Sequence, residues 1–147
     1  MNRDSRLSSV LHALLHMAEH AGPMTSETLA ECMRTNPVVV RRTMGLLRDK
    51  GIVASARGKA GGWTIAADLA QISLRDLYDA LGEPAIFAIG HRSDNPDCLV
   101  EQAVNAALGD AFAQAEAQLM TRFGAVSLAD LAEDFARRHR QVRQHRD

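Results

Sequence analysis

The spacing of hydrophobic residues predicts a chain built mainly from helices. Apolar residues recur every three or four positions over residues 7–21, which is the period of an amphipathic helix. Gly22 and Pro23 interrupt this pattern. A shorter helical pattern follows in SETLAECMR, and either Thr25 or Ser26 can cap its N-terminus. Two helices separated by a break therefore precede the segment TNPVVVRR.

The segment TNPVVVRRTMGLLRDKG predicts a third helix with defined ends. Asn36 suits the N-cap, and Pro37 suits the first helical position because its missing N–H needs no partner there. Gly51 suits the left-handed residue that ends a helix. The residues expected in the core are spaced by four and three: Val40, Met44 and Leu47. The short turn before this helix predicts a helix-turn-helix.

Two short β-capable runs, IVASA and WTIA, surround a basic and glycine-rich tip, RGKAGG. This pattern predicts a β-hairpin. A helix-turn-helix followed directly by such a hairpin is a winged helix. The segment SLRDLYDALGE predicts a further helix that packs on this domain, with Ser73 as its cap. We therefore expect a mainly α fold with a small β-hairpin, in which residues 1–83 form the winged-helix domain.

The second half of the chain predicts an oligomerisation element. Residues 84–97 form a connecting segment, and a long helix follows over about residues 97–123. Its apolar stripe is wider than one small domain requires, which indicates a homodimer. A final short helix, SLADLAEDFARR, completes residues 98–139, and residues 140–147 form a polar tail that we expect to be frayed. The expected dimer interface comprises Val100, Val104, Leu108, Ala111, Phe112, Ala115 and Leu119.

Composition narrows the class of protein. Hydrophobic residues make up 46% of the 147 residues but aromatic residues only 4%, so the core should be aliphatic. The chain contains no apolar run of the roughly 20 residues that a membrane span needs, and no signal peptide is evident. Its two cysteines argue against a disulfide framework. These features predict a cytoplasmic protein.

Charge is distributed unevenly along the chain, although the net charge is only −1. Residues 1–63 contain nine Lys/Arg and five Asp/Glu, a balance of +4. Residues 64–136 contain three Lys/Arg and twelve Asp/Glu, a balance of −9. Residues 137–147 contain five Lys/Arg and one Asp/Glu, a balance of +4. A basic winged-helix segment joined to an acidic one predicts a module that binds a polyanion such as double-stranded DNA.

The third helix carries the expected DNA contacts. If its apolar stripe faces the core, its arginines face solvent, where they can bind phosphates or a guanine edge, and valine methyls can contact thymine. A solvated charged face is the competing interpretation. The basic hairpin tip favours DNA, because such a tip suits an adjacent minor groove. The expected DNA-binding residues are Thr25, Ser26, Asn36, Pro37, Val38, Arg41, Arg42, Arg48, Arg57 and Lys59.

Five segments together resemble the Rrf-two family of bacterial winged-helix regulators: RLSSVLHALLHMAE, TNPVVVRR, LLRDKGIV, GKAGGW and ISLRDLYDALGE. The resemblance extends from about residue 5 to residue 131. It implies a homodimeric DNA-binding transcription regulator, usually a repressor, whose long helix crosses that of its partner. It places the recognition helix at residues 36–48 and the wing at residues 57–63.

The chain departs from the cluster-binding members of that family. Those members place three cysteines before and within the long helix, whereas this chain has only Cys98 there. One thiol with His91, Asp94 and Asp97 is a poor donor set for an iron–sulfur cluster, which usually needs four mainly thiolate ligands. The chain therefore resembles the cluster-less branch, and we expect no cofactor and no metal site.

Several other residues admit two interpretations. His12, His16 and His20 are four apart and could bind a metal ion, but such a stripe is more typical of a polar surface. Cys32 is expected to be a small buried hydrophobe. Trp63 could line a ligand pocket, but we favour a role in anchoring the wing to the domain. The sequence offers no nucleophile–base pair or paired carboxylates, so we expect no enzymatic activity.

Cys98 is the expected sensor residue. If Asn95 or Asp97 caps the long helix, Cys98 lies in its first turn, where the helix dipole favours the thiolate. Alternatively, Cys98 has only a structural role, as a small residue packed under the connecting segment. We therefore expect a repressor that responds to a redox, electrophile or small-molecule signal. The alternatives are a winged-helix protein-interaction module without DNA binding, and a metal-responsive regulator.

Overall fold

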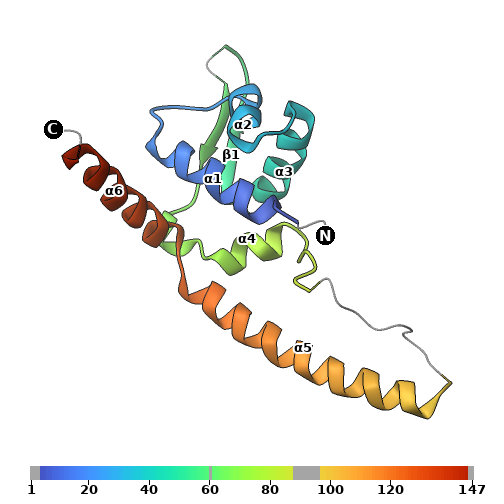
Figure 1. Ribbon diagram of the computed structural model, residues 1–147. Coiled ribbons are helices and arrows are strands. Elements are labelled where there is room, and N and C mark those ends of the chain that lie inside the picture. The colour runs from blue at the N-terminus through green and yellow to red at the C-terminus, as the bar shows by residue number, and fades with distance from the viewer. Residues whose placement is uncertain (1–3, 60, 88–96, 146–147) are drawn as a thin grey trace.

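The computed structural model describes residues 4–59, 61–87 and 97–145 (Figure 1). Within these ranges the fold is mainly helical with one small hairpin, so the predicted fold class is confirmed. The elements, in chain order, are α1 (Arg6–Glu19), α2 (Ser26–Met33), α3 (Pro37–Asp49), β1 (Val53–Ala56), β2 (Gly62–Ile65), the 3₁₀-helix η1 (Leu69–Gln71), α4 (Leu74–Ala80), α5 (Leu99–Ala125) and α6 (Leu128–Gln144).

An aliphatic core holds α1, α2, α3 and α4 together. The predicted stripe of α3 is confirmed, because Val40, Met44 and Leu47 are fully buried. Leu14 of α1 and Leu29 of α2 are fully buried in the same core. Burial of one such side chain stabilises the fold by about 1.5–3 kcal/mol. This packing fixes which side of α3 remains on the surface.

Short polar side chains define the helix starts as the sequence predicts. The Thr25 hydroxyl accepts a hydrogen bond from the Thr28 N–H and caps α2. Asn36 caps α3 in the same way through the Val39 N–H, with Pro37 at the first helical position. α1 ends at Glu19, two residues earlier than the expected boundary at residue 21.

The wing is fixed to the helices by main-chain and side-chain bonds. β1 and β2 pair antiparallel, with Ser55 opposite Trp63. Met24 forms a bridge with Trp63, in which each residue donates its N–H to the other's carbonyl. The indole N–H of Trp63 also donates to the Ser26 hydroxyl at 3.0 Å. At Gly62, φ is +141° and a Cβ atom would lie 2.5 Å from the Met24 carbonyl oxygen, so glycine is required. The predicted role of Trp63 as the wing's anchor is confirmed.

The C-terminal helix belongs to the winged-helix body. Leu128, at the start of α6, is fully buried in its core. Ser73 and Ser127 form an antiparallel bridge, and each caps its own helix through a capping box. The expectation of a frayed tail from residue 140 is wrong, because α6 continues to Gln144. α6 therefore packs with the winged helix, which the expected boundaries at 98 and 139 did not anticipate.

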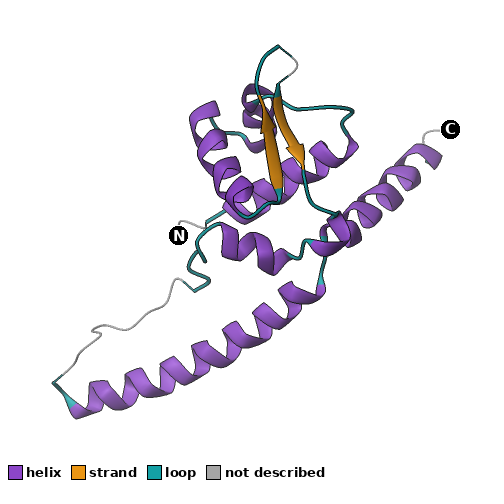
Figure 2. Cartoon of the chain, turned by 180° about the vertical axis from the view of Figure 1, so that it is seen from behind, coloured by secondary structure: helices purple, strands orange, loops and turns teal. Residues whose placement is uncertain are grey.

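α5 leaves this body as a long separate arm, as both views show (Figures 1 and 2). None of its 27 residues is buried in the chain. It begins at Leu99 with Cys98 as its N-cap residue, so the expected cap at Asn95 or Asp97 is wrong. Asn95, with His91 and Asp94, lies outside the described residues.

We predict that Leu128→Ala lowers the free energy of unfolding by about 2–5 kcal/mol, because it leaves a cavity in the core. Val142 of the same helix is 57% exposed, so Val142→Ala should change that free energy by less than about 0.5 kcal/mol. Urea denaturation at one protein concentration measures both. Equal effects of the two substitutions would contradict the packing of α6 on the winged helix.

Candidate nucleic-acid interface

The exposed side of α3 is basic and also presents apolar surface, from Val38 and Leu46. Because Val40, Met44 and Leu47 face the core, Arg41, Arg42 and Arg48 emerge on the exposed side. Val38, in the first turn, is 58% exposed although it is apolar. An exposed valine among arginines has no packing role within the chain. This side of α3 matches what contact with base edges and phosphates requires.

The three arginines differ in their ion pairs. The Arg41 guanidinium lies 3.8 Å from a Glu27 carboxylate oxygen on α2, and that of Arg48 lies 3.7 Å from Asp49. Both pairs are largely exposed, so each is worth little and a phosphate can replace the carboxylate. Arg42 makes no ion pair with any described residue. The Glu27 partner was not foreseen, because the contact joins two helices and no sequence spacing signals it.

Other expected DNA-binding residues have structural roles as well. Thr25 and Asn36 cap α2 and α3, and the Ser26 hydroxyl accepts the bond from Trp63. Thr25 and Asn36 remain exposed, whereas Ser26 and Pro37 are half-buried. These residues therefore set the start of each helix, and Thr25 and Asn36 also keep exposed surface there.

The wing tip lies at the same end of the molecule as the start of α3, far from α5 (Figure 1). Arg57 and Lys59 are both exposed at this tip. Ala60 lies outside the described residues. The structure thus places the wing tip and the start of α3 at one end of the winged-helix body and the long helix at the other, while Arg48 lies in the last turn of α3.

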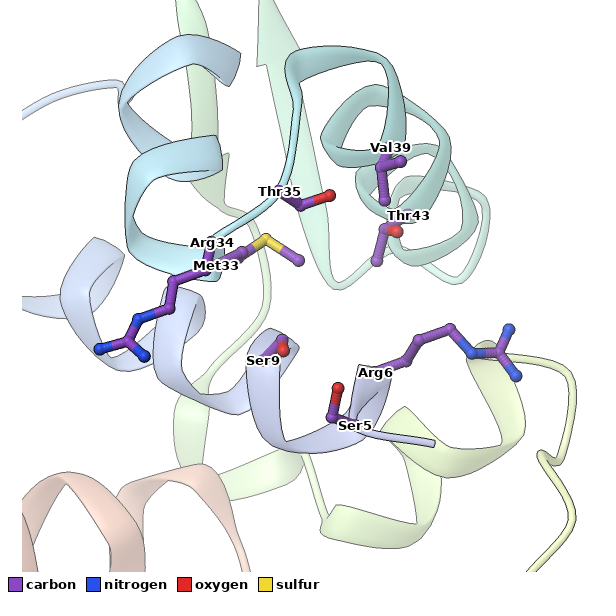
Figure 3. A pocket seen from close by; sticks show the side chains of 8 residues that line it. All are labelled: Ser5, Arg6, Ser9, Met33, Arg34, Thr35, Val39 and Thr43. Carbon is purple, nitrogen blue, oxygen red and sulfur yellow. The ribbon is translucent and has the colours of Figure 1, made fainter. Parts of the chain in front are cut away.

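A cavity of about 190 Å³ lies between α1, the end of α2 and the flank of α3 (Figure 3). The guanidinium groups of Arg6 and Arg34 point outward from it. Thr43 lies at its inner side, is 7% exposed and makes no hydrogen bond with a described residue through its hydroxyl. The cavity joins three separate elements, so no periodicity in the sequence signals it. Four hydroxyl-bearing residues line it: Ser5, Ser9, Thr35 and Thr43.

Cys98 is exposed at the N-terminus of α5. The backbone N–H of Glu101, and to a smaller extent that of Val100, lowers the pKa of this thiol, because their positive ends stabilise the thiolate. Cys32 is half-buried and packs against the core, as expected. The two thiols therefore differ in access and in environment.

The comparisons with known proteins agree with this architecture. A family model described as "Rrf2: Iron-dependent Transcriptional regulator" matches residues 3–134. The chain belongs to the Rrf2 (Rrf-two) family. Members of the Rrf2 family are transcription regulators, so the chain is a DNA-binding transcription regulator with a winged helix, and the predicted family is confirmed.

Individual relatives cover almost the whole chain. YwnA of Bacillus subtilis, named as an HTH-type transcriptional regulator, is 34% identical over 131 residues, which are 87% of this chain and 95% of YwnA. The crystal structure of a transcriptional regulator from Lactobacillus plantarum is 26% identical, covers 97% of both chains and gives a TM-score of 0.74. The structure of CymR, the global cysteine regulator of B. subtilis, is 17% identical with a TM-score of 0.63 and covers 90% of this chain and 97% of CymR. CymR thus supports the Rrf2 fold alone. The homologues are regulators rather than enzymes.

The iron named in the Rrf2 family description does not fit the donors of the described residues. Cys32 packs against the winged-helix core, and Cys98 is at the start of α5. No group of three or more His, Cys, Asp or Glu residues that could hold a metal ion occurs in the described ranges. A cluster needs about four ligands, mostly thiolates. In the same ranges, no helix is long and apolar enough to cross a membrane.

Proposed function

We propose that the chain acts as a homodimeric repressor that binds two half-sites of an operator through α3 and the wing. The exposed arginine side of α3 carries this proposal, because it combines cations, an exposed valine and helix N-terminal N–H groups. In this proposal, Arg41 and Arg42 contact base edges or phosphates of the operator. Arg57 and Lys59 contact the neighbouring DNA backbone. Glu27 holds Arg41 until a phosphate displaces it.

The unburied helix α5 supports dimerisation. Of the expected interface residues, Val100, Val104, Ala111 and Ala115 are exposed and share one side of the helix. Phe112 stacks on Phe87 of its own chain at 5.3 Å between ring centroids. Leu108, Phe112 and Leu119 are half-buried already, so the four exposed residues form the surface that a second copy would cover.

Two features support a chemical signal. The exposed Cys98 thiol, with its lowered pKa, contains more thiolate at neutral pH than an ordinary thiol and reacts faster with electrophiles and oxidants. The cavity beside Thr43 offers space for a small-molecule effector against the flank of α3. It is smaller than the roughly 300–1,000 Å³ of pockets for drug-sized ligands, so a small metabolite is the matching size. Modification of Cys98 acts at the start of α5, and an effector acts on α3 directly.

We predict that replacing Arg41 and Arg42 together by Ala abolishes most operator affinity. Each residue should contribute about 1–3 kcal/mol if it contacts a base, and a phosphate contact should instead flatten the salt dependence. Arg75 on α4 has a side chain 53% exposed, close to the 54% of Arg41, so Arg75→Ala is the matched control. Fluorescence anisotropy with an operator fragment at several salt concentrations measures the affinities of the wild type, the double variant and Arg75→Ala. Wild-type affinity in the double variant would refute the role of α3.

We predict that Val104→Asp converts the dimer to a monomer, because an unpaired carboxylate would be buried in the interface. Val104 is 50% exposed in the single chain, so the substitution spares the fold of each copy. Ala106→Asp places the same charge on the opposite side of α5 and should leave the dimer intact. Light scattering gives the mass of each variant. A wild-type protein that is monomeric at micromolar concentration would rule out the proposed dimer.

We predict that Cys98 is alkylated by iodoacetamide with a half-maximal rate at a pH below the roughly 8.5 of a free thiol. The direction follows from the lowered pKa, since the rate reaches its plateau above that pKa. Cys98→Ser leaves only the half-buried Cys32 and measures the background. Alkylation of the wild type should release the operator and leave Cys98→Ser bound. Equal release of both proteins would show that Cys98 is not the sensor.

A further inference from the structure

Three histidines of α1 separate into a pair and a single residue. His20 makes its own local bond, with its Nδ1 3.1 Å from the Gly22 carbonyl oxygen. The Nε2 atoms of His12 and His16 face each other at 3.1 Å. Their rings are tilted by 46°, with centroids 4.7 Å apart, so the rings do not stack in parallel. Among described residues, each of these two rings has its hydrogen bond with the other.

The distance between the two Nε2 atoms suits a shared metal ion. Imidazole nitrogens bind zinc-like ions at about 2.0–2.1 Å. Two bonds of that length to atoms 3.1 Å apart enclose an angle of roughly 100° at the metal. This value lies between the angles of square or octahedral and of tetrahedral coordination, so an ion can bridge the pair with small ring movements.

The surroundings of the pair leave room for the remaining ligands. His12 and His16 line a concavity of about 170 Å³ together with Glu19, Leu15 and, from α6, Phe135. A concavity of this size has room for more than one water molecule. No third described residue completes the donor group, so water would supply the other ligands of a bound ion. The Glu19 carboxylate on the same rim adds negative charge that favours a cation.

We propose that His12 and His16 form a two-histidine chelate for a late first-row divalent transition-metal ion, at the concavity between α1 and α6. Imidazole favours Ni²⁺, Cu²⁺ and Zn²⁺ over Mg²⁺ and Ca²⁺, which prefer oxygen ligands. This site is separate from the α3 surface and from Cys98, and it holds whether or not the chain represses transcription. A bound ion links two successive turns of α1 and raises the stability of the folded state by mass action.

The test is a titration of the full chain with Ni²⁺. Isothermal calorimetry measures the binding, and ¹H–¹⁵N spectra locate the ion because the paramagnetic Ni²⁺ broadens nearby amide signals. We expect saturable binding, with broadening around Leu15 and Phe135, and no such binding of Mg²⁺. His12→Ala and His16→Ala should each weaken Ni²⁺ binding by about tenfold or more, because each removes one of two ligands. His20→Ala, on the same helix, is the matched control and should bind as the wild type does.

The proposal fails if the wild type shows no saturable Ni²⁺ binding, or if Mg²⁺ competes with Ni²⁺ for the same site in calorimetry. It also fails if only one of His12→Ala and His16→Ala weakens binding, because a chelate needs both ligands. Both variants replace exposed side chains, and circular dichroism checks that each is folded. Broadening centred on Cys98 rather than on α1 would place the ion elsewhere and overturn the assignment.

Discussion

The burial of one side of α3 is the constraint on which the interface depends. The hydrophobic core contains three fully buried residues of α3: Val40, Met44 and Leu47. Rotation of α3 about its axis would therefore expose at least one of them. Each such exposure would cost about 1.5–3 kcal/mol. The basic side of α3 is therefore held outward by aliphatic packing, while its own ion pairs are weak enough to be exchanged. Stability and the proposed DNA contact use opposite sides of the same helix and do not compete.

The second constraint is the exposed apolar surface of α5. A helix of 27 residues is about 40 Å long, and in the single chain it contacts its own body mainly at α4. The edge contact of Tyr78 with Phe123 and the stacking of Phe87 on Phe112 cover only one side. The exposed valines and alanines on the adjacent side form the surface that the proposed second copy would cover. A second copy that covers them would also present two α3 helices from one particle, as half-site recognition requires.

Local rules predicted the winged helix well because its signals are short-range. Asn36, Pro37 and Gly51 mark the ends of α3 within the sequence itself, and the residues around RGKAGG mark the hairpin. The placement of α6 was missed because it depends on a contact between Ser73 and Ser127, more than fifty residues apart. A signal was present, since ISLRDL and VSLADL share one pattern and both start with a capping box. Contacts between helices, such as Arg41 with Glu27, have no counterpart in periodicity.

The position of α4 determines how events at α5 can reach the DNA-binding surface. α4 packs against α5 on one side and against α3 on the other, whereas Cys98 lies at the start of α5. Under the proposed sensing by Cys98, a change there would reach α3 through the packing of α4 against both α5 and α3, because packed side chains in a dense core shift together. The cavity beside Thr43 lies directly between α1 and α3 and needs no such relay. An effector in that cavity would change the tilt of α3 within one chain, whereas a change at α5 would alter the separation of two copies. The two routes are thus distinguishable, since the first survives in a monomer and the second requires the dimer.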